Sequence, residues 1–120
     1  MTETRIARTP QPPYYAVIFT SRYTDADTEG YGRMAEKIGE LARAQPGYLG
    51  FESARDAAGI GISVSYWESE EAIRNWKGLA EHLIAQRTGR ERWYVDYTVR
   101  VAKVERAYTL DSSAKVGLER

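Results

Sequence analysis

The chain has 120 residues, enough for one domain, and its 17 basic and 17 acidic residues give a formal net charge of zero. Nucleic-acid modules usually carry a basic surplus on one face, and a membrane helix needs about 20 consecutive apolar residues; neither feature is present, so neither partner is expected. With no cysteine and one histidine, disulfides and thiolate metal ligands are excluded, and we predict a cytoplasmic protein without a metal site.

Residues 1–13 carry charges and end in the proline-rich run 10–13. Proline favours extended backbone without ladder hydrogen bonds, so we predict a loosely docked N-terminal arm and no secretory signal. Residues 14–20 are aromatic and β-branched, which predicts a first strand buried on both faces. After a turn-rich stretch, apolar residues at three- and four-residue steps predict a helix that ends at Gln45-Pro46-Gly47.

Two alternating segments follow, residues 48–55 and 60–67, with a hairpin turn at 56–59 between them. Ser69 is a good N-cap for a second helix, whose apolar stripe includes Ile73 and Trp76. The longest predicted strand spans residues 93–108. Its apolar parity switches near residue 102, which indicates either a bulge or a change in the surface that the strand covers.

The element order is β-α-β-β-α-β, so the expected fold is α+β, a ferredoxin-like arrangement with a four-stranded antiparallel sheet in residues 14–108. Residues 109–120 are polar and predict a C-terminal tail. Two helices can cover only one face of such a sheet, yet apolar residues occur on both. Because an open apolar face needs a partner, we predict a homodimer packed sheet to sheet, in which the long strand takes part.

The sequence matches the patterns of known metal, nucleophile and phosphate sites only weakly. Carboxylate pairs such as Glu70 and Glu71 stand where a helix start favours them, which argues against a metal shell. The run 61–65 lacks the last glycine of a nucleophile elbow, and Gly30-Tyr31-Gly32 lacks the rest of a phosphate-binding fingerprint. We interpret these segments as structural.

Aromatic residues carry the remaining signal, since three tryptophans and nine tyrosines are many for this length. Aromatics at helical spacing are most often core, but their gathering around the sheet also suits a pocket for a flat organic ligand. Trp76 is the candidate wall of that pocket and His82 the candidate base, and a structural role for either residue stays open. The predicted substrate pocket is lined by Phe19, Phe51, Tyr66 and Trp67.

Several segments together resemble one known family. These are the runs Pro13 to Phe19, Gln45 to Gly50, Val64 to Ser69, and Trp76 to His82. In this order they are similar to the antibiotic biosynthesis monooxygenase domain family, particularly its bacterial branch of heme-degrading-like proteins. The resemblance spans about residues 13–108.

The resemblance implies a dimeric α+β barrel and oxygenation without flavin or a bound prosthetic metal. In its heme-degrading members a Trp and a His on the second helical region act together with an Asn on the first strand. Trp76 and His82 are the nearest matches here, whereas the only asparagine is Asn75. We therefore expect a cofactor-independent monooxygenase for a small aromatic or quinone-type substrate. The alternatives are heme cleavage, with heme as the substrate, and a non-catalytic dimeric module that binds ligands or is associated with a stress response.

Overall fold

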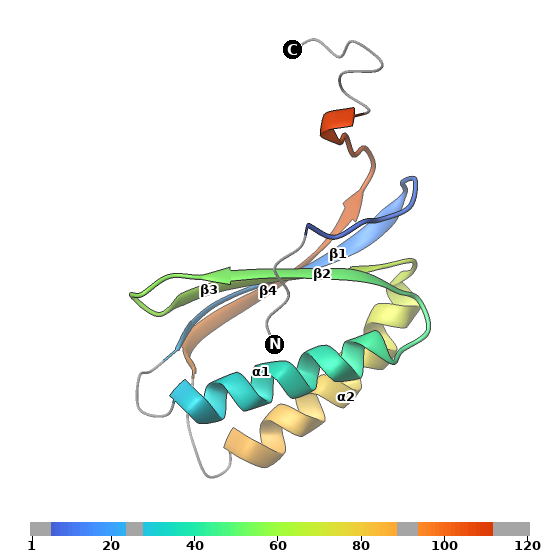
Figure 1. Cartoon of the computed structure of the whole chain (residues 1–120). Helices are drawn as coiled ribbons and strands as arrows, with labels where there is room; N and C mark the ends of the chain where they lie inside the picture. The colour runs from blue at the N-terminus through green and yellow to red at the C-terminus, as the bar shows by residue number, and fades with distance from the viewer. Residues whose placement is uncertain (1–5, 24–27, 89–93, 112–120) are drawn as a thin grey trace.

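The computed structural model describes residues 6–23, 28–88 and 94–111; for residues 23, 28–35, 83–88, 94 and 95 it describes the backbone alone. The element order confirms the predicted βαββαβ arrangement (Figure 1). The elements are β1 (Tyr14–Tyr23), α1 (Thr28–Arg43), β2 (Tyr48–Arg55), β3 (Ile60–Trp67), α2 (Glu70–Thr88) and β4 (Tyr94–Val104). Trp93, the expected start of the last strand, lies outside the described residues.

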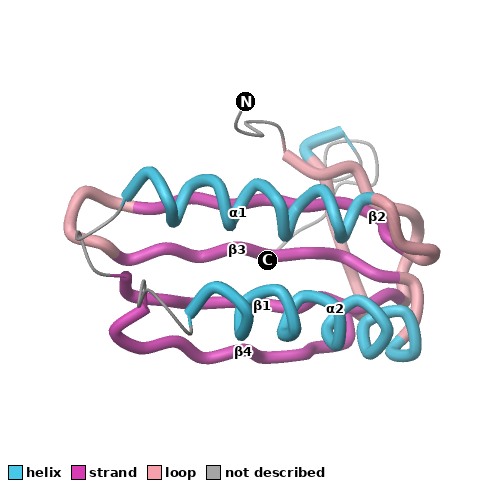
Figure 2. The backbone as a smooth tube through the Cα atoms, turned by 90° about the horizontal axis from the view of Figure 1, so that it is seen from below, coloured by secondary structure: helices cyan, strands magenta, loops and turns pink. Residues whose placement is uncertain are grey.

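The four strands form one antiparallel sheet in the order β2-β3-β1-β4. Both helices lie on the same side of this sheet, as Figure 1 shows. Seen from the helix side, α1 runs along β2 while α2 runs along β1 and β4 (Figure 2). The sheet therefore has a helix-facing side and a side without helices, which we call the open face.

Local signals at the element ends act as predicted. The Ser69 hydroxyl accepts a hydrogen bond of 3.1 Å from the Ala72 backbone N–H, which caps α2. The Asp56 carboxylate accepts the N–H groups of Ala58 and Ile60 and closes the β2–β3 turn. After α1 the chain reverses at Gly47, whose φ of 87° is a conformation that favours glycine.

Trp67 organises the core. It is fully buried, and its indole N–H donates a 2.8 Å hydrogen bond to the hydroxyl of the buried Ser65. The buried residues packed around it come from β1 and both helices: Val17, Ala42, Ala72 and Ile73. The core thus sits beneath the helices at the end of the sheet where β1 begins.

The parity switch in β4 has a simple cause. The pairing of β4 with β1 is regular from Tyr97 to Val104, and the one shift in that pairing falls at Arg22/Tyr23. The prediction of a bulge near residue 102 is therefore wrong. The alternative, a change in the surface that the strand covers, holds. Val99 and Val101 face the helices, whereas Ala102 and Val104 lie opposite Ala16 and Tyr14 on the open face.

The segments that flank the sheet differ from each other. Residues 6–13 lie on the open face and contact the sheet, which is described below. Beyond β4 the described residues 105–111 leave the sheet and point away from the body (Figure 1). Among the helices that the structure describes, none has the length and apolar character needed to cross a membrane.

Candidate functional site

The strand register divides the side chains between two faces. Val17 belongs to the core under the helices, so Phe19 and Ser21, two and four residues on, point to the same side. Their cross-strand partners on β4 are Val99 and Tyr97, and Val101 lies opposite Val17. The rings of Phe19 and Tyr97 are 5.3 Å apart, which confirms that they share a face.

Three of these helix-facing residues are uncovered: Tyr97 is 54% exposed, Val99 38% and Val101 49%. Together with Phe19 they form what we call the β4 apolar surface. In Figure 2 α2 passes in front of β1 and β4, yet these side chains remain accessible. The helix-facing side of the sheet therefore has an accessible apolar surface at its β4 edge.

A pair of tryptophans stands beside this surface. The rings of Trp67 and Trp76 are 5.3 Å apart and tilted by 32°, and Tyr48 meets Trp67 edge to face. The Trp76 indole nitrogen is buried and has no hydrogen-bond partner among the described residues. An unpaired buried donor is costly, so this N–H is a candidate contact for a ligand.

Ser21 offers a second polar group on the helix-facing side. It is 3% exposed, and its hydroxyl finds no partner in the part of the chain that the structure describes. Trp67 lies opposite Tyr15, and Ser21 is six residues further along β1. At about 3.3 Å per residue, Ser21 lies roughly 20 Å along the strand from Trp67, against which Trp76 packs. A small ligand can therefore contact only one of the two polar groups at a time.

The predicted pocket residues divide between the two faces. Phe19, Phe51, Trp67 and Trp76 belong to the helix-facing side, with Phe51 opposite Ser65. Tyr66 points to the open face, where its hydroxyl donates a 2.8 Å hydrogen bond to Glu52. Burial, together with Glu52, raises the pKa of the Tyr66 phenol above its ordinary value. Tyr66 therefore does not line the same space as the other four.

His82 lies on the outer side of α2. The buried positions of this helix include Ala72, Ile73 and Ala80, with Trp76 in the same stripe. At 3.6 residues per turn, His82 is turned roughly 135° from the middle of that stripe, and its side chain is exposed. The structure thus brings Trp76 to the core side of the helix and leaves His82 away from it.

The sequence reasoning missed four residues of this site. The alternation of β4 shows that Tyr97, Val99 and Val101 share a face, but it does not say which face the helices cover. No sequence pattern marks Ser21 as a site residue, because its burial depends on the packing around it. Among the described residues, no group of three or more His, Asp or Glu side chains could hold a metal ion.

Comparisons with known proteins agree with this architecture. The family model described as antibiotic biosynthesis monooxygenase matches residues 14–88. The chain is 54% identical over 101 residues to the uncharacterized protein YqjZ of Bacillus subtilis, which covers 84% of this chain and 88% of that protein. It is 32% identical over 95 residues to the jasmonate monooxygenase ABM of Pyricularia oryzae. That match covers 75% of this chain but only 43% of the fungal protein.

Solved structures show the same fold. PA3566 from Pseudomonas aeruginosa superposes with a TM-score of 0.61 at 17% identity, covering 82% of this chain and 99% of that one. A variant of SnoaB from Streptomyces nogalater, described as a cofactor-independent oxygenase, gives a TM-score of 0.59 at 14% identity, with 81% and 96% covered. The family model and the sequence relatives together show family membership. The chain belongs to the antibiotic biosynthesis monooxygenase family.

Proposed function

We propose that this chain is a cofactor-independent monooxygenase whose small aromatic or quinone-type substrate lies on the β4 apolar surface, beneath α2. One observation carries the proposal: Tyr97, Val99 and Val101 face the helices and are nevertheless 38–54% exposed. The family supports oxygenase chemistry, and SnoaB is itself described as a cofactor-independent oxygenase.

The chemistry of the surface suits a flat ring system. Small-molecule sites are mostly apolar, with a few polar groups that fix orientation. A ring stacked on Phe19 and Val99 would cover apolar area at about 25 cal/mol per Å². The Trp76 N–H at one end, or the Ser21 hydroxyl at the other, would then bind an oxygen of the substrate.

The chemistry needs no cofactor when the substrate supplies the electrons. An anthrone loses a proton from its CH2 ring carbon and gives a carbanion, which adds dioxygen to form a peroxide anion. Return of the proton to this anion gives a hydroperoxide. Loss of water from the hydroperoxide leaves the ring carbonyl, so one oxygen atom enters the product and the other leaves as water. Apolar walls would favour the step because a poorly solvated carbanion is more reactive toward dioxygen.

Turnover of dithranol, a dihydroxyanthrone, tests the proposal through oxygen uptake above the rate without protein. Val101→Arg places a charge within the β4 apolar surface and should abolish uptake. Ser53→Arg is the matched control, because Ser53 is an exposed helix-side residue on the opposite edge strand, about 14 Å away across the sheet. It should keep the wild-type rate. Binding of dithranol without uptake in the wild type would favour the ligand-binding module instead.

We also propose that the chain works as a homodimer. On the open face Ile60 is 38% exposed and Ile62 46%, and neither helix can reach them. A second copy packed against this face would remove that apolar surface from water. Sedimentation velocity at micromolar concentration should show a dimer, and a sharp monomer boundary would refute this part of the proposal.

A further inference from the structure

The N-terminal arm, residues 6–13, is joined to one end of the open face by specific contacts. The Ala7 backbone N–H donates a 2.9 Å hydrogen bond to one carboxylate oxygen of Glu52, and Tyr66 donates to the other. The Thr9 hydroxyl and the Tyr14 phenol are 2.8 Å apart and share a hydrogen bond. Tyr14 is buried and meets the Tyr66 ring edge to face at 5.9 Å.

The sheet beneath the arm is shaped to receive it. A Cβ atom on Gly50 would lie 3.0 Å from the Ala7 Cβ, so a larger residue would push the arm away. Glu52 is half-buried and both its oxygens have partners, which makes the contact a charge-assisted one. The arm is thus a built part of the domain, although its sequence predicts only loose docking.

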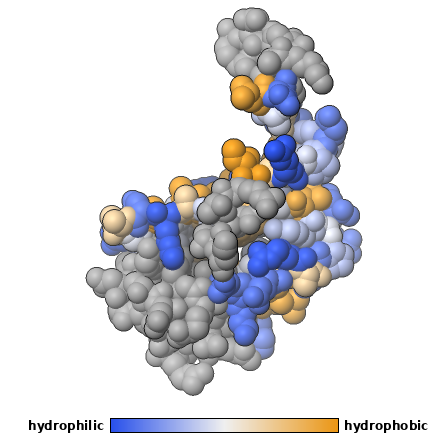
Figure 3. All heavy atoms as spheres, viewed as in Figure 1, coloured by the Kyte–Doolittle hydropathy of each residue, from blue (hydrophilic) through white to orange (hydrophobic). Residues whose placement is uncertain are grey.

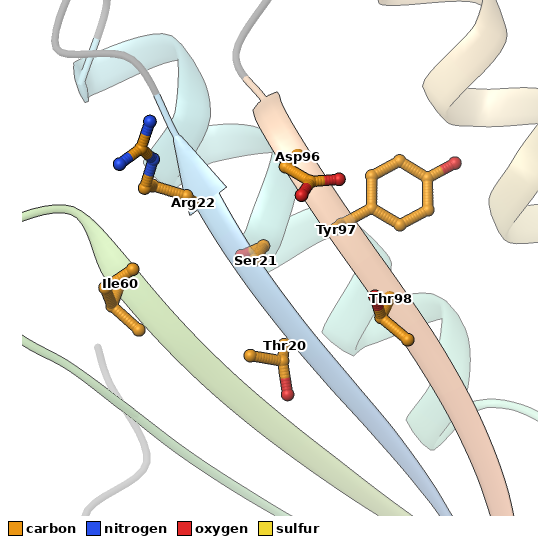
Figure 4. A pocket seen from close by; sticks show the side chains of 7 residues that line it. All are labelled: Thr20, Ser21, Arg22, Ile60, Asp96, Tyr97 and Thr98. Carbon is orange, nitrogen blue, oxygen red and sulfur yellow. The ribbon is translucent and has the colours of Figure 1, made fainter.

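A hollow marks the other end of the open face. The hollow, of about 500 Å³, lies at this end of β1, β3 and β4 (Figure 4). Five of its lining residues belong to the open face, namely Thr20, Arg22, Ile60, Asp96 and Thr98, and it also reaches Ser21 and Tyr97 of the helix-facing side. Ile60 on β3 lines it, and the exposed Ile62 lies opposite Thr20, another lining residue. Figure 3 shows hydrophobic residues along the sheet's upper side next to strongly hydrophilic ones. Both kinds of surface therefore meet on this side of the sheet.

The charges at this end come in both signs. Arg22 and Asp96 are cross-strand partners in the β1–β4 register, and both are exposed. A two-fold interface brings the same patch from each copy together, so it must be complementary to itself. A patch with an apolar centre and one charge of each sign at its rim meets that condition, because Arg22 of either copy can face the acidic group of the other.

We propose that residues 6–13 are an intramolecular strap that occupies the Tyr14–Tyr66 end of the open face, and that a second copy of this chain docks only on the Ile60–Ile62 end. The inference rests on the proposed homodimer and adds where the two copies meet. The strap takes the place that a second copy would otherwise cover. It therefore fixes how far the two sheets overlap.

Single cysteines test the docking site, because the chain has none of its own. Ile62→Cys and Val101→Cys are matched, at 46% and 49% exposure on opposite faces. We expect the maleimide reaction of Ile62→Cys to slow about tenfold between nanomolar and micromolar protein, while that of Val101→Cys stays constant. An unchanged Ile62→Cys rate, equal protection of both, or a monomer at all concentrations would overturn the proposal. Dithranol turnover is measured separately, so failure of the docking site is distinguishable from failure of the proposed function.

Trypsin cleavage after Arg8 tests the strap itself. Glu52→Ala removes the acceptor of the Ala7 N–H, and cleavage at this exposed arginine should become about tenfold faster, as expected for loss of a charge-assisted hydrogen bond. Tyr66→Phe keeps that acceptor and should cleave at close to the wild-type rate. Absence of cleavage after Arg22, Arg55 and Arg100, which lie in the strands, shows that the sheet stays folded. Wild-type cleavage as fast as in Glu52→Ala would overturn the strap.

Discussion

Replacing Trp67 or Trp76, the two neighbouring tryptophans, by phenylalanine should give unequal losses of stability. In Trp67→Phe the smaller ring loses about 1–2 kcal/mol of buried apolar contact. The buried Ser65 hydroxyl also loses its 2.8 Å partner, at about 1–3 kcal/mol. The sum is about 2–5 kcal/mol, a large share of the roughly 5–15 kcal/mol that stabilises a domain of this kind.

Trp76→Phe loses similar ring area but removes a buried N–H that has no partner among the described residues. Relief of that unpaired donor offsets the lost contact, so the net change should stay within about 1 kcal/mol. The same variant should weaken dithranol binding if the N–H contacts the ligand. Urea denaturation, followed by circular dichroism, measures both free energies of unfolding. Equal losses in the two variants, with dithranol binding unchanged in Trp76→Phe, would refute the distinction between a core tryptophan and a site tryptophan.

Other variants test other parts of the account. Gly47→Ala should lower the free energy of unfolding by about 2–5 kcal/mol, because φ is 87° and the new Cβ would lie 2.7 Å from that of Ala72. Gly78→Ala, with open space around the new Cβ, should stabilise α2 by about 0.5–1 kcal/mol in the same urea assay. The raised pKa of Tyr66 favours its neutral form in the folded state, so the stability it contributes is present below the ordinary value of 10.0 and is lost as the pH rises above it. Denaturation between pH 9 and about pH 12 should therefore show a smaller loss for Tyr66→Phe than for the wild type. His82→Ala should leave dithranol affinity unchanged. Titration with heme should give no saturable Soret shift that depends on His82. A stoichiometric, His82-dependent shift would restore heme as the substrate.

Much of the fold could be predicted because local chemistry decides it. The Ser69 cap, the Asp56 turn and the reversal at Gly47 depend on residues close in sequence, and each is present. Alternation along the strands likewise gave the four-stranded sheet. These signals concern hydrogen bonds and backbone conformations that the residue types themselves prefer.

The site was harder to predict, because it depends on which face each element turns to a distant one. Tyr66 and Trp67 are neighbours in sequence, and only the sheet register shows that they face opposite sides. Trp76 and His82 share a helix, and their separation around it follows from the buried stripe. The docking of the arm joins Ala7 to Glu52, 45 residues apart, and no local pattern encodes that contact.

Methyl NMR tests the central claim most directly, since it reports where an aromatic ligand binds. Val99 and Val101 lie on the β4 apolar surface, whereas Val64 lies opposite Ile18 on the open face. Titration with anthraquinone should shift the methyl signals of Val99 and Val101 saturably and leave those of Val64 in place. Saturable shifts of Val64 alone, or no shifts at Val99 and Val101, would contradict an aromatic site between α2 and β4.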